Sequence, residues 1–287
     1  MKLRHIFERY ELDPEDLNVE ILDMSAGTDT FERFDRFNKK YNPFNKTDFR
    51  DVFLKIDNHI EGQYLAEITK EVFEKYTLSK SQFYEPRISI YGRNSAEWSK
   101  LAHWIDKYEL YHPQVRWLIQ IPRLYEAYRK AGLIQNFQEM LNNIFKCLFE
   151  VTINPESNPK LYKFLLQVVG FDSVDDESIY ELGPHATTFQ VTPENWNYPE
   201  NPNYCYWAYY LWANIHTLNQ LRKARGLNSF AFRPHSGEAG SYEHLMGTYL
   251  LADSINHGIR LTKAPVLEYL YYLKQIGLAV SPLSNNK

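Results

Sequence analysis

A histidine and a glutamate, His235 and Glu238, stand three residues apart in the segment 232–240, directly after a short apolar run. An imidazole can bind zinc through one ring nitrogen, and a nearby carboxyl group that is not a ligand can move protons for an attacking water. Gly237 and Gly240 are expected to let the backbone turn sharply and to leave space for a substrate. The spacing is also typical of an ordinary turn with a hydrogen-bonded histidine and a surface glutamate, so both interpretations stay open.

A second histidine, His257, lies in the motif Asn256-His257-Gly258 at the end of the next predicted strand. The interval between His235 and His257 fits one strand–helix–strand step, so we expect both to emerge from adjacent strands at the same face of a barrel. Two histidines favour a metal site, although three protein ligands are usual at catalytic zinc. His244 is predicted to lie on the solvent side of the intervening helix and is not counted as a ligand.

Two charged runs have less specific interpretations. The run Arg36-Phe37-Asn38-Lys39-Lys40-Tyr41 interleaves basic and aromatic residues. It is either a solvated loop or a phosphate clamp, in which basic side chains supply charge and a ring lies against a base. The acidic run Asp175-Asp176-Glu177 follows a strand candidate. Its oxygens suit a metal ion, but acids in this position also cap helices.

These residues need a scaffold, and the chain alternates short apolar runs with amphipathic helices. Strands are predicted over residues 87–91, 115–121, 168–172 and 229–233, up to His257, and over 278–280. Helices are predicted over residues 60–76, 137–148, 204–221 and 243–253, after Asn94 with Glu97 in capping-box position, and from Pro265 to a C-cap at Gly277. Such alternation favours a parallel sheet with helices outside and functional residues at the carboxyl ends of the strands.

The composition narrows the class of protein. The chain of 287 residues is 44% hydrophobic and 16% aromatic, which we interpret as a well-filled globular core. Its net charge is −4 and its pI about 6.2, which argues against a nucleic-acid-binding protein. No apolar run approaches a membrane span, no signal peptide is visible, and Cys147 and Cys205 match no metal spacing. We therefore expect a cytoplasmic protein with both cysteines in the core.

Longer motifs carry a family resemblance, and together they extend over essentially the whole chain. They are Thr30-Phe31-Glu32-Arg33-Phe34-Asp35-Arg36-Phe37-Asn38-Lys39-Lys40-Tyr41-Asn42-Pro43, Arg87-Ile88-Ser89-Ile90-Tyr91-Gly92, Val169-Gly170-Phe171-Asp172, Phe232-Arg233-Pro234-His235-Ser236-Gly237-Glu238-Ala239-Gly240, His257-Gly258-Ile259, and Tyr271-Tyr272-Leu273 with Ser281-Pro282-Leu283-Ser284-Asn285-Asn286. In these motifs the chain resembles the AMP deaminases, in the adenosine/AMP deaminase branch of the metal-dependent amidohydrolases.

The resemblance implies a zinc-dependent hydrolase that converts AMP to IMP and ammonia in purine nucleotide metabolism and that is typically a homotetramer. It implies that His235 binds the zinc and that Glu238 gives a proton to the ring nitrogen next to the attacked carbon. It also implies that His257 orients or deprotonates the zinc-bound water. The run from Arg36 to Tyr41 matches the family's substrate-binding loop, and its basic residues suit the 5′-phosphate that distinguishes AMP from adenosine.

The sequence departs from the family pattern at two places. The family's first barrel strand carries a His-x-His pair and its last strand an Asp-Asp pair; no His-x-His occurs here, and the Asp-Asp pair is expected to follow Asn286. We therefore expect an incomplete TIM-type (β/α)₈ barrel lacking its first and last strands, with residues 1–86 as a substrate-loop and helical region and 87–287 as the central and later β/α units. We expect little turnover from this chain alone. The alternatives are a catalytically inactive nucleotide-binding or regulatory paralogue and an adenosine deaminase-like hydrolase.

Overall fold

The computed structural model describes residues 53–179, 181 and 190–281, together with the positions His5, Glu8 and Glu11. The predicted substrate-binding run at residues 36–41 lies outside the described residues. The chain divides into two compact units, one formed by Met1–Val72 with Pro282–Lys287 and the other by Phe73–Ser281. In the described part of the first unit, Ile60 is buried against the aromatic rings of Phe53 and Tyr64.

The second unit contains the described strands, and every pairing among them is parallel. They are β1 (Arg87–Ser89), β2 (Trp117–Pro122), β3 (Val168–Val174), β4 (Ala231–Phe232), β5 (His235–Ser236), β6 (Ser254–His257) and β7 (Gly277–Ala279). Hydrogen bonds order them as two sheets, β1-β2-β3-β4 and β5-β6-β7. The predicted α/β arrangement with parallel strands is confirmed, and it is compatible with a partial barrel.

One extended segment joins the two sheets. Only Arg233 and Pro234 separate β4 from β5, and both still bond to neighbouring strands. The Arg233 N–H donates to the carbonyl of Phe171 at 2.7 Å, and the Pro234 carbonyl accepts from the Asn256 N–H at 2.9 Å. Proline has no N–H to donate, so it interrupts the ladder. The predicted strand over residues 229–233 is therefore wrong in its bounds, since β4 is shorter and the segment continues past the proline to carry His235 in β5.

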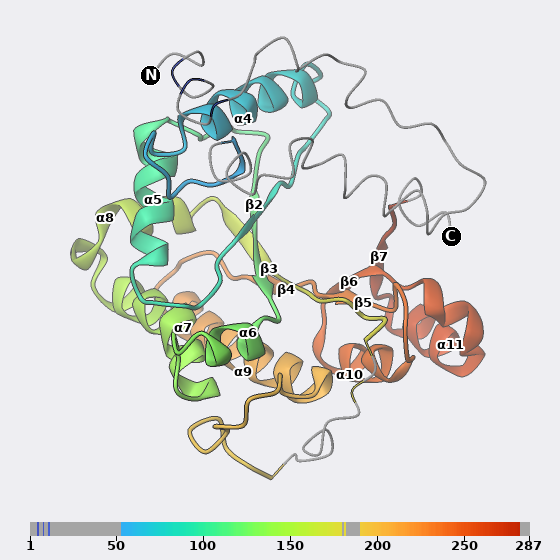
Figure 1. Ribbon diagram of the computed structural model, residues 1–287. Coiled ribbons are helices and arrows are strands. Elements are labelled where there is room, and N and C mark those ends of the chain that lie inside the picture. The colour runs from blue at the N-terminus through green and yellow to red at the C-terminus, as the bar shows by residue number, and fades with distance from the viewer. Residues whose placement is uncertain are drawn as a thin grey trace. The chain divides into compact units, whose positions relative to one another are not determined.

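Helices lie beside these strands in the second unit. Figure 1 shows β2, β3 and β4 crossing the centre of the view, with α5, α7 and α8 to one side. Helices α10 and α11 lie next to β5, β6 and β7. The helices, including α4 that begins in the first unit, are α4 (Gln63–Tyr76), α5 (Glu97–Lys107), α6 (Tyr125–Lys130), α7 (Phe137–Ile153), α8 (Pro159–Leu165), α9 (Tyr204–Ala224), α10 (Glu243–Leu251) and α11 (Pro265–Lys274), with 3-10 turns η3 (Pro155–Ser157) and η4 (Ile259–Lys263). The predicted alternation of strand and helix is confirmed.

Helix α7 forms where the apolar periodicity predicts it. The side chain of Asn136 accepts the N–H of Glu139 at 2.9 Å, and the Glu139 carboxylate accepts the N–H of Gln135 at 2.6 Å, so the first turn has side-chain partners for its exposed donors. The face it buries repeats every three or four residues and consists of Phe137, Met140, Leu141, Ile144, Phe145, Leu148 and Val151. This face packs toward the strands and contributes much of the core.

The predicted capping box at α5 is wrong. The N-cap is Ala96, without a side-chain hydrogen bond, and Asn94 instead accepts the Ala96 N–H at 3.0 Å. The Glu97 carboxylate turns back to the loop after β1, where it accepts the N–H groups of Tyr91 at 2.7 Å, Gly92 at 2.9 Å and Arg93 at 3.2 Å. Satisfying three consecutive loop donors, one of them buried, with one carboxylate is more favourable than capping one exposed donor.

Helix α11 begins at Pro265 as predicted, but its predicted C-cap at Gly277 is wrong. Gln275 is the C-cap, with left-handed φ of 57°, and its N–H bonds to the carbonyls of Tyr271 and Tyr272. Gly277 instead starts β7 and pairs with Ser254. Gly277 must be extended in order to pair in β7, so the helix ends two residues earlier, at Gln275.

The core between strands and helices is rich in aromatic rings, as the composition predicted. Trp98 is fully buried and its indole N–H donates to the Ile144 carbonyl at 2.7 Å. Trp207 is also fully buried and donates to the Ser173 hydroxyl at 2.9 Å. The two cysteines, predicted as core, are only half-buried. Among the described helices, none combines the length and apolar character needed to cross a bilayer.

Candidate active site at the ends of three strands

The ends of β5 and β6 bring the two candidate histidines together. The strands pair in parallel with His235 opposite Asn256 and Ser236 opposite His257. The imidazole rings of His235 and His257 have centroids 4.9 Å apart at an interplanar angle of 63°. The prediction that both emerge from adjacent strands at one face is confirmed.

The third strand supplies a partner for His235 that the sequence analysis did not single out. Asp172 lies near the end of β3, its side chain is fully buried, and its Oδ1 lies 2.8 Å from Nδ1 of His235. A carboxylate accepts only, so Nδ1 of His235 donates to it, and in the neutral imidazole Nε2 then presents its lone pair. This is the arrangement in which a histidine commonly binds a metal through Nε2.

The same carboxylate anchors an arginine from the first strand. Arg87 donates from Nε to Asp172 Oδ2 at 2.8 Å and from Nη2 to Asn256 Oδ1 at 2.6 Å. The amide of Asn256 donates back to Asp172 Oδ1 at 3.2 Å. The sequence places Arg87 and Asp172 in predicted strands and family motifs but indicates no role for either. The signal that could have found them is a charged residue inside an otherwise apolar strand, because a buried charge requires a partner.

Glu238 and His257 face each other across the site. Their nearest side-chain atoms, Oε2 and Nε2, are 3.6 Å apart, with His257 almost buried and Glu238 partly open to solvent. His257 has a φ of 76°, a conformation that residues other than glycine rarely adopt and that costs on the order of 1–3 kcal/mol. Gly258 continues the turn with a φ of 70°. The strained backbone of His257 therefore lies at the residue whose imidazole faces Glu238.

The two glycines of the loop turn the backbone as predicted, but the space beside them is filled by protein. Gly237 has a φ of 74° and Gly240 a φ of 64°. A Cβ on Gly237 would lie 2.8 Å from a methyl carbon of Leu245, and one on Gly240 would lie 1.8 Å from the carbonyl oxygen of Glu177. The prediction that these glycines leave room for a substrate is therefore wrong, since they permit close packing of the loop on its neighbours.

The last residue of the acidic run after β3, Glu177, holds the loop that carries Gly237 and Glu238. Glu177 is buried and accepts the N–H groups of Gly237 at 2.6 Å and Glu238 at 3.2 Å. It therefore neither caps a helix nor presents free oxygens to a metal. Its neighbour Asp176 accepts the N–H of Ser178 at 3.0 Å, as in a turn.

Asp175, the first residue of the acidic run, forms an ion pair with the Arg123 guanidinium. Burial raises the pKa of the Asp175 carboxyl above its ordinary value, while Arg123 acts in the opposite direction. Arg123 also reaches Glu181, at 2.8 Å. These contacts tie the end of β3 to the segment that precedes α9.

The placement predicted for His244 is wrong. Its side chain is buried rather than on the solvent side of α10, with Nδ1 3.3 Å from Oε2 of Glu177. Its ring stacks on that of Tyr204, with centroids 4.0 Å apart and an interplanar angle of 13°. Burial raises the pKa of the Tyr204 phenol well above its ordinary value, so its hydroxyl stays a donor. The helix periodicity could not reveal this, because α10 is apolar on most sides.

The described residues contain no group of three His, Cys, Asp or Glu side chains that could hold a metal ion. His235 has the proton arrangement of a metal ligand, but a tight zinc site needs at least three protein ligands.

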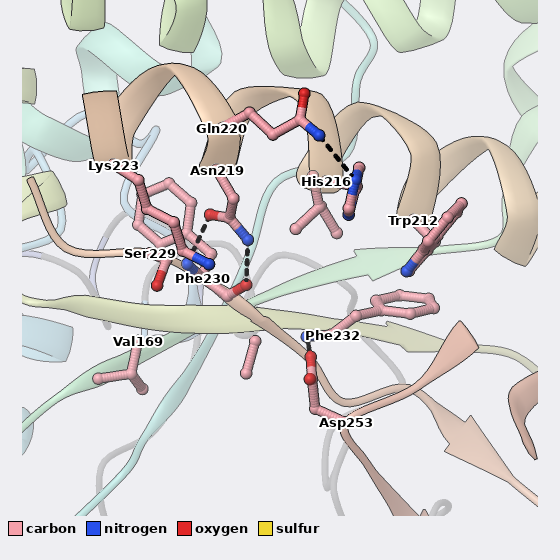
Figure 2. A pocket seen from close by; sticks show the side chains of 12 residues that line it. Val169, Trp212, His216, Asn219, Gln220, Lys223, Ser229, Phe230, Phe232 and Asp253 are labelled. Atoms are coloured by element: carbon pink, nitrogen blue, oxygen red, sulfur yellow. Dashed lines mark hydrogen bonds between the residues drawn. The ribbon is translucent and has the colours of Figure 1, made fainter. Parts of the chain in front are cut away.

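A hollow of about 340 Å³ lies apart from this site, between α9 and the start of β4 (Figure 2). Its polar groups are largely engaged in holding those elements together. Asn219 bonds to both backbone groups of Phe230 at 2.8 Å, and the Asp253 carboxylate accepts the Phe232 N–H at 2.8 Å. The hollow lies at the amino ends of the strands, away from the carboxyl ends that carry His235 and His257.

Comparison with known proteins gives consistent matches. A family model described as AMP deaminase matches residues 1–287. The AMP deaminase of Schizosaccharomyces pombe is 53% identical over 288 residues, which cover 100% of this chain and 34% of that protein. The AMP deaminase of Arabidopsis thaliana is 53% identical over 286 residues, 100% of this chain and 34% of that protein. Human AMP deaminase 3 is 50% identical over 284 residues, 99% of this chain and 37% of that protein. The chain thus spans about a third of the length of these relatives.

Proposed function

The chain belongs to the AMP deaminase family, and we propose that it contributes part of the active site of an enzyme that hydrolyses the 6-amino group of AMP to give IMP and ammonia. The observation that carries this proposal is the convergence of His235, Glu238 and His257 at the ends of two adjacent parallel strands. A hydrolytic deamination needs a proton donor for the purine ring and a base for the attacking water. These side chains supply both kinds of group within one site.

Glu238 is the proposed proton donor to the ring nitrogen next to the attacked carbon. Its side chain is 29% exposed, so a ligand can reach it, while its backbone N–H is held by a hydrogen bond to the buried Glu177 carboxylate. Protonating the ring nitrogen withdraws electrons from the carbon that water attacks. His257 is the proposed group that orients or deprotonates this water, and its position 3.6 Å from Glu238 supports the two side chains acting at one reacting centre.

His235 is proposed as one zinc ligand. The bond from its Nδ1 to Asp172 supports this role, because it fixes the tautomer with Nε2 free to bind a metal. Zinc in such a site polarises the attacking water so that it reacts near neutral pH. Asp172 in turn keeps its position through Arg87 and Asn256, which would hold the His235 ring fixed while a metal binds.

AMP rather than adenosine is the proposed substrate. The names of the relatives support this choice, since each is an AMP deaminase. The basic and aromatic run Arg36-Phe37-Asn38-Lys39-Lys40-Tyr41 is proposed to bind the 5′-phosphate and the base, because clustered basic groups hold phosphate strongly. We further propose that the fold is part of a TIM-type barrel and that the enzyme is a cytoplasmic homotetramer.

A chimera tests the proposal directly. These 287 residues would replace the matching segment of the Schizosaccharomyces pombe relative, which supplies the rest of that protein. We expect the chimera to release ammonia from AMP, to contain zinc and to prefer AMP over adenosine. The unmodified relative serves as the control for expression and metal loading. A folded, zinc-loaded chimera that turns over neither nucleotide would exclude the proposal, and one that prefers adenosine would exclude AMP as the substrate.

A second candidate is a family member that binds nucleotide without turnover. It predicts AMP binding by calorimetry, no zinc and no ammonia. The chimera separates the two candidates, because a segment evolved without catalysis would leave the recipient protein inactive.

A further inference from the structure

Two consecutive backbone amides of the loop after β5 bind one buried carboxylate. Gly237 N–H donates to Oε2 of Glu177 at 2.6 Å and Glu238 N–H donates to Oε1 at 3.2 Å. The side chain of Glu177 is only 1% exposed. Because each carboxylate oxygen accepts one amide N–H, Glu177 fixes both the position and the orientation of the backbone at Gly237 and Glu238.

The carboxylate is itself supported from the opposite side. Nδ1 of His244 lies 3.3 Å from Glu177 Oε2, and the His244 ring is stacked on Tyr204. The Tyr204 hydroxyl donates to the carbonyl of His235 at 2.5 Å. The segment from His235 to Glu238 is therefore held at its beginning by Tyr204 and at its end by Glu177, and these two supports touch each other through His244.

The backbone of Glu177 is fixed against the same loop. A Cβ on Gly240 would come within 1.8 Å of the Glu177 carbonyl oxygen, so the two segments are packed backbone to backbone. The loop therefore packs directly on the Glu177 backbone, and it cannot move away from Glu177 without breaking the pair of amide bonds. This interlock makes Glu177 a rigid reference point for Glu238.

We propose that Glu177 is a positioning residue for Glu238, with His244 and Tyr204 keeping its carboxylate in place. The inference rests on the proposed function, in which Glu238 must reach the purine ring from a fixed direction. Glu177 does not touch the substrate and does not bind the metal. It acts through the two amides, which hold the Cα of Glu238 so that the side chain points toward His257 at 3.6 Å.

Replacing Glu177 by glutamine tests this role with almost no change in shape. Glutamine has one acceptor oxygen, so it keeps one of the two amide bonds and places its own N–H₂ group against the other amide. We expect the Gly237 or Glu238 amide to exchange with solvent about 10-fold faster or more, the range for losing one hydrogen bond to a charged acceptor. We expect kcat for AMP to fall about 10- to 100-fold, as for a misplaced catalytic group, with KM less affected.

Glu97→Gln is the matched control. Glu97 is another buried carboxylate that accepts consecutive loop amides, those of Tyr91, Gly92 and Arg93, and it has no contact with Glu238. We expect Glu97→Gln to lower the Tm comparably while leaving exchange at Gly237 and Glu238 and the kcat unchanged. A kcat loss in both variants in proportion to their Tm would overturn the positioning role.

The measurements separate the failure of this inference from the failure of the proposed function. Amide exchange is measured by NMR on the 287-residue chain, and kcat and KM in the chimera. Unchanged exchange in Glu177→Gln overturns the inference whatever the activity, and so does faster exchange with a normal kcat in an active chimera. Faster exchange together with a chimera that is inactive before mutation removes the proposed function and, with it, the catalytic part of the inference.

A milder variant covers the case in which Glu177→Gln does not fold. His244→Phe keeps a ring that can stack on Tyr204 and removes the 3.3 Å bond to Glu177, together with a longer contact of 3.9 Å with Glu181. We expect faster exchange at Gly237 and a smaller loss of kcat in the same direction. A folded His244→Phe variant with exchange and kcat equal to the parent protein would show that Glu177 needs no support from His244.

Discussion

The buried carboxylate of Asp172 should be the most costly single polar group to neutralise. Its two oxygens lie within hydrogen-bonding distance of four side chains, those of Arg87 at 2.8 Å, His235 at 2.8 Å, Asn256 at 3.2 Å and Gln120 at 3.4 Å. Asp172→Asn keeps the shape but leaves one acceptor oxygen and turns an N–H₂ group toward donors. The variant therefore loses at least two bonds to a charged acceptor and leaves Arg87 without its ion pair.

The magnitude follows from those losses. A hydrogen bond to a charged group contributes about 1.5–3 kcal/mol, and breaking a buried ion pair from one side costs about 3–5 kcal/mol. Arg87 keeps a third of its side chain in contact with solvent, which moderates its part of the loss. We expect Asp172→Asn to lower the free energy of unfolding by about 3–4 kcal/mol and the Tm by roughly 10 °C.

Urea denaturation and differential scanning calorimetry measure this effect, with Asp106→Asn as the control. Asp106 also pairs with basic side chains, Lys163 at 3.0 Å and Lys160 at 3.5 Å, but at the protein surface. Exposed ion pairs contribute about 0–1 kcal/mol, so the control should change the Tm little. If Asp172→Asn were no more destabilising than Asp106→Asn, the assignment of Asp172 as the anchor of the site would be refuted.

Three further predictions concern the loop, the core and pH. Gly240→Ala should abolish AMP turnover in the chimera and lower the Tm, because the added Cβ meets the Glu177 carbonyl at 1.8 Å; a normal kcat would contradict the interlock. Trp98→Phe should cost about 2–3 kcal/mol in urea denaturation, since it leaves a cavity and removes the indole hydrogen bond to the Ile144 carbonyl. Burial raises the pKa of the Cys147 thiol to about 12, above its unfolded value, so the folded state holds this proton longer. The folding stability that depends on the protonated Cys147 thiol is complete below pH ~8.5 and falls as the pH rises toward 12. A plot of Tm against pH should show this decline, and Cys147→Ser should reduce it.

The sequence was sufficient to predict the strand ends that carry chemistry. Alternating strands and helices indicated a parallel sheet, and His235 and His257 were correctly expected at adjacent strand ends. Such inferences succeed because strand and helix periodicity is local, and because parallel strands bring their carboxyl ends to one edge.

The buried polar contacts that hold the site residues in place could not be predicted in the same way. The bonds from Arg87 to Asp172 and from Glu177 to the loop at Gly237 join residues far apart in the chain, and nothing in their local sequence encodes the pairing. His244 was misplaced because the helix that carries it is apolar on nearly every side, so periodicity gave no buried face. Buried polar groups are paired according to what the fold brings near them, which a local pattern does not contain.

The rate of ammonia release from AMP by the chimera with Glu238→Gln tests the central claim most directly. Glutamine fills the same space and keeps the backbone bond to Glu177, but it cannot give a proton to the purine ring. The proposed role predicts that kcat falls about 10²- to 10⁴-fold, the usual contribution of a general acid, while zinc content and Tm stay unchanged. A kcat within a few-fold of the unmodified chimera would contradict the assignment of Glu238 as the proton donor and of this loop as the catalytic centre.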